Sequence, residues 1–208
     1  MATAVANIIT ASTLLERRIH SAPPEGWSLK SAAGRFIALD PTPESGTATL
    51  SLAAGLIREA QQQEGLAAWI AGPRQSFFPP DMAAAGVDLA TLPIVRTTDA
   101  GQAARVADTL LRSGSFSVLI LDGDGQAFPL ALQTRLVGLA QQHHTALVAL
   151  RQSGDRPSRG SLVSLRGATE QHRVGHNCFA CGLRARKDKR QSPGWTHEEF
   201  RHGPDGLC

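Results

Sequence analysis

The sequence has few cysteines and no long apolar run. Its cysteines, Cys178, Cys181 and Cys208, are odd in number, so they do not form a disulfide framework and suit a reducing compartment. No apolar stretch approaches the roughly 18 residues that a membrane-spanning helix needs. Residues 1–15 lack the basic start and cleavage-like site of a secretory signal. We therefore expect a cytoplasmic protein.

A lysine is missing from a segment that otherwise reads as a phosphate-binding loop, residues 43–50. The usual loop, G-x-x-x-x-G-K-[ST], places a lysine on the outer phosphates of a nucleotide and a hydroxyl on Mg²⁺. Here Thr47 stands at the lysine position and Ala48 at the hydroxyl position. Without that cation and that ligand, we expect no tight ATP binding of the usual kind. The residues of this degenerate loop are Glu44, Ser45, Gly46, Thr47 and Ala48.

The hydrophobic pattern predicts an α/β fold in a chain long enough for one sizeable domain. Compact apolar segments that suit strands lie at residues 36–39, 66–71, 92–95, 116–121 and 145–150. Helical patterns lie at residues 10–19, 47–63, 81–85, 99–112 and 130–142. Strands that are apolar on both faces and alternate with helices are typical of a parallel sheet covered on both sides. We expect residues 1–30 to form a helix and linker, and residues 31–208 to form the core.

Basic residues are concentrated in the last quarter of the chain. Residues 1–150 carry ten Lys and Arg against twelve Asp and Glu, whereas residues 151–208 carry eleven against six. Such a distribution favours a polyanion or an acidic partner at the carboxyl end, although an ordinary solvated surface remains the alternative. Within this region, residues 151–160 read as a polar loop. Further strands are expected at residues 161–165, 179–186 and 198–202.

Four segments carry recognisable motifs. Residues 34–50 read as Gly-Arg, an apolar strand and a shortened G-P-E-S-S-G-K-T-T-L loop, and residues 85–92 resemble A-L-G-V-D-x-x-x-L. Residues 112–114 give R-S-G before the strand that ends at Asp122, and residues 132–136 resemble L-Q-A-R-L. This set resembles the RecA recombinase core and, more closely, the shortened RecA-like ImuA family, an accessory of bacterial mutagenic translesion synthesis. The resemblance implies a mostly parallel central sheet flanked by helices, with antiparallel strands at the carboxyl-terminal end.

The departures from RecA fall on catalytic positions. Where RecA has its catalytic glutamate, this chain has Pro73, so no carboxylate orients an attacking water. Asp122 resembles the Walker B aspartate, but one carboxylate without its Ser or Thr partner is a poor magnesium site. An acid that simply ends a strand is an equal alternative for Asp122. We therefore expect a chain without enzymatic activity and without a cofactor.

The resemblance also places possible DNA and partner contacts. The first DNA-binding loop of RecA is missing here, whereas residues 151–164 stand where RecA carries its second loop. Arginines in this segment suit phosphate contacts, but it lacks the aromatic residues that stack bases, so a simple connector is the alternative. Residues 186–189 resemble the K-N-K element by which one RecA protomer reaches its neighbour's nucleotide; a basic tip without a ligand is the alternative. The candidate DNA or partner contacts are Arg151, Arg156, Arg159, Arg166, Arg184, Arg186, Lys187, Lys189 and Arg190.

Four soft donors lie within ten residues, as a zinc site would need: His172, His176, Cys178 and Cys181. Two cysteines three apart in a strand point to opposite faces, however, and ten contiguous residues give a cramped geometry. Free cysteine packs readily as a small apolar residue. We therefore expect no metal here.

Three functions follow from these readings. The first is a non-catalytic RecA-like adaptor in DNA-damage tolerance, for which the resemblance implies three protein partners and DNA. These partners are an ImuB-like homologue of Y-family polymerases, an error-prone replicative-type polymerase and RecA itself, and homo-oligomers are also compatible. Residues 1–19 and the basic segment near Lys187 are the expected contact surfaces. The alternatives are a weak DNA-dependent ATPase and a SulA-like division inhibitor that acts by protein binding.

Overall fold

The structure is a computed structural model that describes residues 26–42, 48–123, 128–152 and 162–202. The expectations for the helix at residues 10–19, for Arg156 and Arg159, and for most of the phosphate loop lie outside these residues. Within them, the first element is the short helix α2 (Leu29–Ala32), so the boundary expected after residue 30 falls inside a helix. Trp27 and Leu29 are buried in the main core, and the Trp27 indole donates to the Leu52 carbonyl at 3.0 Å.

Strands and helices alternate along most of the described chain, as the sequence pattern predicts. The strands are β1 (Phe36–Pro41), β2 (Leu66–Ala71), β3 (Ile94–Arg96), β4 (Phe116–Asp122), β5 (Ala146–Leu150), β6 (Leu165–Gly175), β7 (Cys178–Asp188) and β8 (Thr196–His202). The helices after α2 are α3 (Thr49–Gln62), α4 (Pro79–Ala84), the 3-10 turn η1 (Leu89–Thr91), α5 (Ala100–Ser113) and α6 (Leu130–Gln142). The α/β class is confirmed.

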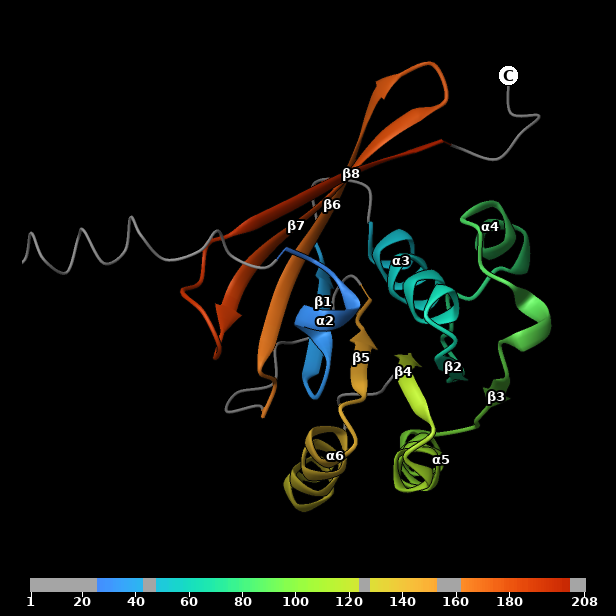
Figure 1. Ribbon diagram of the computed structural model, residues 1–208, viewed down its shortest axis with the longest axis vertical. Helices are drawn as coiled ribbons and strands as arrows, with labels where there is room; N and C mark the ends of the chain where they lie inside the picture. Colours follow the sequence, from blue (N-terminus) through green and yellow to red (C-terminus); the bar gives the residue numbers. More distant parts are fainter. Residues whose placement is uncertain (1–25, 43–47, 124–127, 153–161, 203–208) are drawn as a thin grey trace, which may run out of the picture.

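All eight strands form one sheet in the order β3-β2-β4-β5-β1-β6-β7-β8. The pairs from β3 to β6 are parallel, and the pairs β6-β7 and β7-β8 are antiparallel. Helices α2, α3 and α4 cover one face of the sheet, and α5 and α6 cover the other (Figure 1). The mostly parallel sheet with antiparallel strands at its carboxyl-terminal end is therefore confirmed.

Burial on two faces explains the apolar strands. On one face, β-strand side chains such as Ile37, Trp69 and Ile120 pack with α3, and on the other face Phe36, Ile70 and Leu121 pack with α5 and α6. A parallel strand between two helical layers has no solvated face, so nearly every residue in it must be apolar. The parallel end of the sheet therefore supplies a rigid platform on which the loops at the strand ends are held.

The helix boundaries have local causes. The Asp99 side chain accepts a hydrogen bond from the Gln102 N–H at 2.8 Å and begins α5. The same helix ends at Gly114, whose φ of 67° is the left-handed conformation that favours glycine. Ser28 and Ser31 form a capping box at α2.

The carboxyl-terminal strands differ from the sequence prediction. The strand expected at residues 161–165 lies instead at Leu165–Gly175, and it forms a long hairpin with β7 that extends beyond the helices (Figure 1). Only the first residues of β6 are buried, and its second half is polar and mostly exposed. An apolar-run criterion finds only strands that are buried on both faces, so it misplaced this one.

None of the helices in the described parts of the chain is long and apolar enough to cross a membrane.

Candidate functional site

The degenerate phosphate loop leads from β1 into α3. Of its five residues, Ala48 is described: it lies at the N-cap of α3, is buried, and gives the helix no side-chain cap. In the next position, the Thr49 hydroxyl lies 2.8 Å from the Thr169 hydroxyl of β6, inside the protein. The first turn of α3 thus offers no acidic residue, and its threonine hydroxyl is already engaged.

Asp122, the Walker B-like residue at the end of β4, is bound by the protein's own groups. Its Oδ2 atom accepts hydrogen bonds from the Trp69 indole Nε1 at 3.2 Å and from the Ser76 backbone N–H at 2.6 Å. Trp69 is held by an edge-to-face contact with Phe77, whose ring centroid lies 5.0 Å away. The segment that follows β2 therefore folds back over the end of β4 and captures the carboxylate.

No cation balances the Asp122 carboxylate among the described residues. The residue is 3% exposed, and its Oδ1 atom is buried without a hydrogen-bond partner in the same part of the chain. Burial raises the pKa of Asp122, and the hydrogen bonds from Ser76 and Trp69 only partly oppose that shift. The surroundings of Asp122 therefore favour its neutral form more than water does.

The loops around Asp122 are packed closely. Gly123 has a φ of 111°, and a Cβ atom at this position would lie 3.3 Å from the Gly72 Cα, so the loops after β2 and β4 touch. The Gln152 side chain, which follows β5, donates to the Arg74 carbonyl. Asp122 and Asp99 line a cavity with about 10 Å³ of water-accessible space, enough for roughly one water molecule. The described parts of the loops after β2, β4 and β5 therefore pack against one another around Asp122.

The described residues around Asp122 offer few ligands for a magnesium nucleotide. Hard cations such as Mg²⁺ bind negatively charged oxygen ligands, usually with a hydroxyl or phosphate beside them. Here the Asp122 Oδ2 is already engaged by two N–H donors, Ala48 offers a methyl group, and Pro73 stands in place of a carboxylate. The expected lone carboxylate of a Walker B motif is thus present, but its environment resembles a core position.

Arg151 differs from the exposed loop arginine expected from the sequence. It is 7% exposed, and its Nη1 lies 3.0 Å from Asp40 Oδ1 at the end of β1. Arg166 on β6 approaches the other oxygen of Asp40 at 3.8 Å. Asp40 therefore joins the ends of three neighbouring strands, and the Arg151 guanidinium is committed to the fold.

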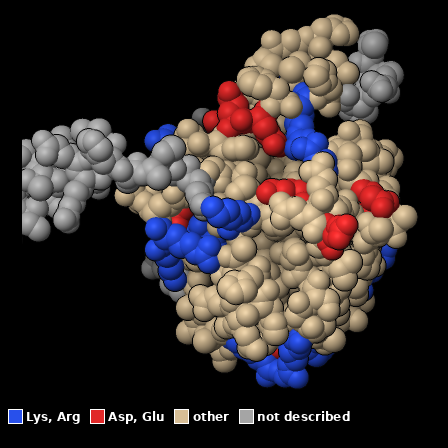
Figure 2. All heavy atoms as spheres, viewed as in Figure 1, with Lys and Arg blue, Asp and Glu red and all other residues tan. Residues whose placement is uncertain are grey.

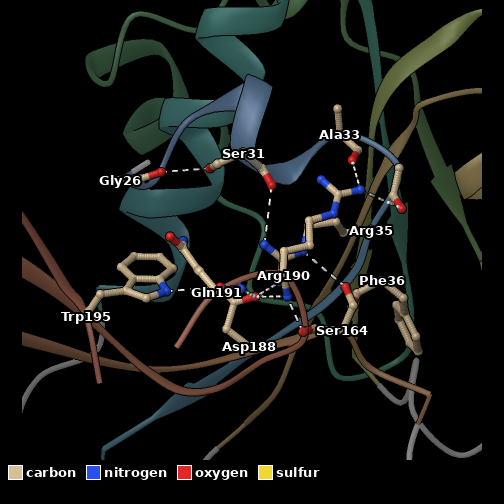
Figure 3. A network of polar contacts seen from close by, with 11 residues as sticks. Gly26, Ser31, Ala33, Arg35, Phe36, Ser164, Asp188, Arg190, Gln191 and Trp195 are labelled. Carbon is tan, nitrogen blue, oxygen red and sulfur yellow. Dashed lines mark hydrogen bonds and ion pairs between the residues drawn. The ribbon is translucent and has the colours of Figure 1, made fainter. Parts of the chain in front are cut away.

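A buried ion pair that the sequence reasoning missed joins Arg35 to Asp188 (Figure 3). The Arg35 Nη2 donates to Asp188 Oδ1 at 2.6 Å, and both side chains are almost fully buried, with 2% and 0% exposed. Arg35 also donates to the Ser164 carbonyl at 3.0 Å and to the Ser31 carbonyl at 3.4 Å. The pair thus ties the start of β1 to α2, to the residue before β6 and to the end of β7.

Asp188 has further donors around it. Its Oδ1 accepts from the backbone N–H groups of Arg190 and Gln191, at 2.8 and 3.3 Å, and its Oδ2 accepts from the Trp195 indole at 3.0 Å. Burial acts to raise the pKa of Asp188, but the hydrogen bonds from Arg35, Arg190 and Trp195 outweigh burial and hold the pKa below its usual value. Asp188, inside the expected K-N-K-like element, is therefore a buried anchor.

Arg190 is also part of this corner. Its Nη2 donates to the Ala33 carbonyl at 2.8 Å and lies 3.5 Å from the Gly34 carbonyl (Figure 3). These carbonyls follow the last turn of α2, where a cationic donor is favourable. Of the described candidate contacts, Arg151, Arg166 and Arg190 thus contact groups of the fold itself.

Four other candidates lie on the outside of β7 and just after it. Arg184, Arg186 and Lys189 are exposed and Lys187 is half-buried. Burial lowers the pKa of Lys187, and so do the nearby charges of Lys189 and Arg166. Basic side chains gather over α2 and the end of β7 (Figure 2). The positive charges of Lys189 and Arg166 therefore lie close enough to Lys187 to disfavour its charged form, and a bound anion would favour that form.

The soft donors do not converge. Cys181 is buried among the core residues under α3, whereas Cys178, His172 and His176 lie toward the end of the β6-β7 hairpin. Burial raises the pKa of the Cys181 thiol, so its protonated form is favoured. Within the described ranges, no three His, Cys, Asp or Glu side chains are placed to hold a metal ion.

Comparisons with known proteins agree with this geometry. Residues 29–152, more than half of the chain, match the family model of the RecA N-terminal domain. The chain is 36% identical over 98 residues to protein RecA of Rubrobacter xylanophilus. The aligned region covers 47% of this chain and 28% of that protein. It is 32% identical over 128 residues to protein RecA of Agrobacterium fabrum, covering 56% of this chain and 34% of that protein. The chain thus spans about a third of the length of these relatives, and it belongs to the RecA N-terminal domain family.

Proposed function

We propose that this RecA-family chain is a non-catalytic adaptor in DNA-damage tolerance. The observation that carries the proposal is the capture of Asp122 by Trp69 and Ser76 in a site that also lacks the lysine, the hydroxyl and the glutamate of a working enzyme. Phosphoryl transfer depends on positioning and on charge stabilisation by such groups. A RecA core without them keeps a rigid sheet and its surfaces, which are sufficient for binding.

DNA is the first proposed ligand. At the end of β7, Arg184, Arg186 and Lys189 are exposed and Lys187 is half-buried; burial lowers the pKa of Lys187, and the charges of Lys189 and Arg166 lower it further. Such a group binds the phosphate backbone without sequence preference and with strong salt dependence.

The proposed protein partners are those of SOS translesion mutagenesis. The motifs of residues 34–136 resemble the ImuA family more closely than RecA, and the match to the RecA N-terminal domain model supports the RecA-like part of that resemblance. The proposed partners are therefore an ImuB-like polymerase homologue, an error-prone replicative-type polymerase and RecA.

Nucleotide turnover tests the loss of catalysis. The purified chain is incubated with ATP and Mg²⁺, with and without single-stranded DNA, beside a RecA protein as positive control. We expect no phosphate release above background and no saturable ATP binding. The variant Thr47→Lys/Ala48→Thr restores the two missing loop groups, and we expect it to remain without turnover because Pro73 and Asp122 are unchanged. Micromolar ATP binding with magnesium-dependent phosphate release by the natural chain would establish the alternative, a weak ATPase.

DNA binding is tested with two matched charge reversals. The variant Arg184→Glu/Arg186→Glu/Lys187→Glu changes the β7 surface, and Arg96→Glu/Arg105→Glu/Arg112→Glu changes three exposed arginines on β3 and α5 by the same net charge. We expect the first variant to have a lower affinity and a salt slope that is smaller by about 1 for each phosphate it no longer binds. We expect the second variant to bind nearly as well as the natural chain. Equal losses in both variants would show that only net charge matters.

Pull-down experiments test the partners. The immobilised chain is offered the three purified proteins separately, and we expect retention of at least one at physiological salt. Retention of the division-ring GTPase alone, together with no affinity for DNA, would establish the SulA-like alternative instead.

A further inference from the structure

Strand β8 is an edge strand of the sheet in the part of the chain that the structure describes. It pairs with β7 from Arg184–Thr196 to Cys178–His202, and it stands last in the strand order of the described chain. An edge strand presents a row of unpaired backbone N–H and C=O groups that can accept another strand. With seven residues, β8 is long for a free edge, because edge strands are commonly kept short.

The middle of this edge carries a large apolar side chain. Phe200 is 62% exposed, and its neighbours on the same face of the strand, Glu198 and His202, are exposed too. On the other face, Glu199 and Arg201 are half-buried and point toward α3, where both approach Gly55. The edge is therefore a short apolar centre with charged residues on either side.

We propose that two copies of this chain associate through β8, paired antiparallel and centred on Phe200. The two-fold axis of such a dimer runs through the sheet at Phe200 and makes one continuous sheet of sixteen strands from the eight in each copy. Phe200 of one copy then lies beside Phe200 of the second copy. Glu199 lies opposite Arg201 of the second copy, and Glu198 lies opposite His202 of the second copy; each of these pairs occurs twice.

Charge complementarity selects this register. Centring the pair one residue earlier places Glu199 opposite its own counterpart, and centring it one residue later does the same to Arg201. Centring on Glu198 brings two copies of that acid together. Like charges directly opposite each other in a sheet are destabilising, whereas opposite charges and aromatic pairs are favourable. If the pairing were centred between two residues, a residue on the α3 face of one copy would lie opposite a residue on the other face of the second copy. The second copy would then be turned over, with its α3 on the other side of the joint sheet.

Glu199 and Arg201, on the face of β8 toward α3, bring an acid and a cation to the proposed contact. The Arg201 Nε lies 3.0 Å from Glu199 Oε1 within the strand, but the Arg201 Nη2 is buried without a hydrogen-bond partner among the described residues. Burial acts to raise the pKa of Glu199, but the His197 imidazole 3.8 Å away and the Arg201 guanidinium at 3.0 Å outweigh it and hold the pKa below its usual value. A second Glu199, one strand away, supplies an acceptor on the same face as that unsatisfied donor.

Charged residues often protect an edge strand from pairing, because they repel an identical strand. In β8 the acid Glu199 and the cation Arg201 stand on either side of Phe200, so these two residues complement a second copy. A contact of one strand is small compared with a stable interface of about 1,200–2,000 Å². We therefore expect a dimer that dissociates at micromolar concentration.

The first experiment measures oligomeric state by sedimentation over a range of chain concentrations, without DNA, nucleotide or partner. The natural chain is expected to show a monomer–dimer equilibrium. Glu198→Lys replaces the acid opposite His202 by a cation, and His202→Glu sets an acid opposite Glu198, in both halves of the interface. Each variant alone is expected to weaken the dimer at least about tenfold, which corresponds to 1.4 kcal/mol.

Mixing the two variants provides the decisive control. In a mixed dimer, the lysine introduced in one copy would face the glutamate introduced in the other, and the natural His202 would face the natural Glu198. Association is therefore expected to return only on mixing. A charge change that merely damages one chain cannot be repaired by adding a second, differently damaged chain. The inner pair Glu199→Arg and Arg201→Glu, made in the same way, tests the other face of the strand.

Phe200→Ser is expected to weaken the dimer, whereas Val174→Ser, which removes a similarly exposed apolar residue at 53% exposure on the β6-β7 hairpin, is expected to leave it unchanged. Circular dichroism and thermal unfolding check that each variant folds. A chain that stays monomeric up to high micromolar concentration would overturn the proposal. So would a dimer that is insensitive to Phe200→Ser, or one that does not return when the complementary variants are mixed.

Discussion

Two buried carboxylates of this chain have pKa values that are shifted in opposite directions. Asp122 and Asp188 both end strands, both are shielded from solvent, and both accept a tryptophan indole N–H. Asp188 also faces the Arg35 guanidinium, and its pKa is lowered, whereas the described partners of Asp122 are neutral dipoles, and its pKa is raised. Burial alone therefore does not decide the charge of a carboxylate; the presence of a cation partner decides it.

The difference also separates two parts of the RecA-like core. At the edge where nucleotide would be held, the charged and hydroxyl-bearing positions have become Thr47, Ala48 and Pro73, and the remaining acid is enclosed. At the Arg35 corner, a full set of donors surrounds Asp188 and joins four segments of the fold (Figure 3). The buried polar groups at the Arg35 corner connect separate segments of the fold through hydrogen bonds and an ion pair.

The largest effect is expected from breaking the Asp188 site. Arg35→Met removes the cation and leaves a buried carboxylate, so we expect a loss of about 3–5 kcal/mol in the free energy of unfolding. Urea denaturation followed by circular dichroism measures it. Arg35→Lys, which keeps the charge but not the fork of donors, is expected to lose less. A loss below about 1 kcal/mol, typical of exposed pairs, would contradict the buried network.

The stability contributed by Asp188 is expected to depend on pH. Because the pKa of Asp188 is lower in the folded state than its ordinary value of 3.8, the stabilisation is complete above that ordinary value. It is lost as the pH falls through the folded-state pKa. We therefore expect the natural chain to lose stability in acid and the gap between it and Arg35→Met to narrow there. A gap that stays constant down to acid unfolding would exclude ionised Asp188 as the source.

The smallest effect is expected at Asp122. Asp122→Asn keeps an oxygen that can accept from Trp69 and Ser76, so we expect a change within about 1 kcal/mol at neutral pH. The pKa of Asp122 is raised, so its contribution is most favourable in acid and is lost as the pH rises through the folded-state pKa. Relative to the natural chain, Asp122→Asn should therefore gain stability with rising pH. A loss as large as that of Arg35→Met would refute the comparison.

The sequence predicted the buried, regular elements well. The strand at residues 66–71 and the helix at residues 130–142 have the predicted bounds, and Asp99 caps α5 as expected. Local periodicity and capping chemistry decide these features, and both are visible in neighbouring residues. β6 was misplaced because half of it is exposed, so its pattern is polar.

For the candidate site, the sequence predicts some residues but not the contacts that they make. Asp122 was found from its motif, but its capture by Ser76 depends on how the chain folds back after β2. Arg151 and Arg190 were grouped with the surface cations, whereas the structure gives both a structural partner. The Arg35–Asp188 pair cannot be predicted from the local pattern, because its members lie 153 residues apart in the sequence.

By itself, the sequence determined the α/β class, the RecA-like order of motifs and the loss of the loop lysine, because these depend on residue type and near neighbours. Only the tertiary structure decided which charges are enclosed and which are offered to solvent. The topology brings β1 beside β6, and β6 beside β7, and so sets Arg35 against Asp188. The free energy of a charged group depends on what surrounds it in space, and the order of residues along the chain does not show those surroundings.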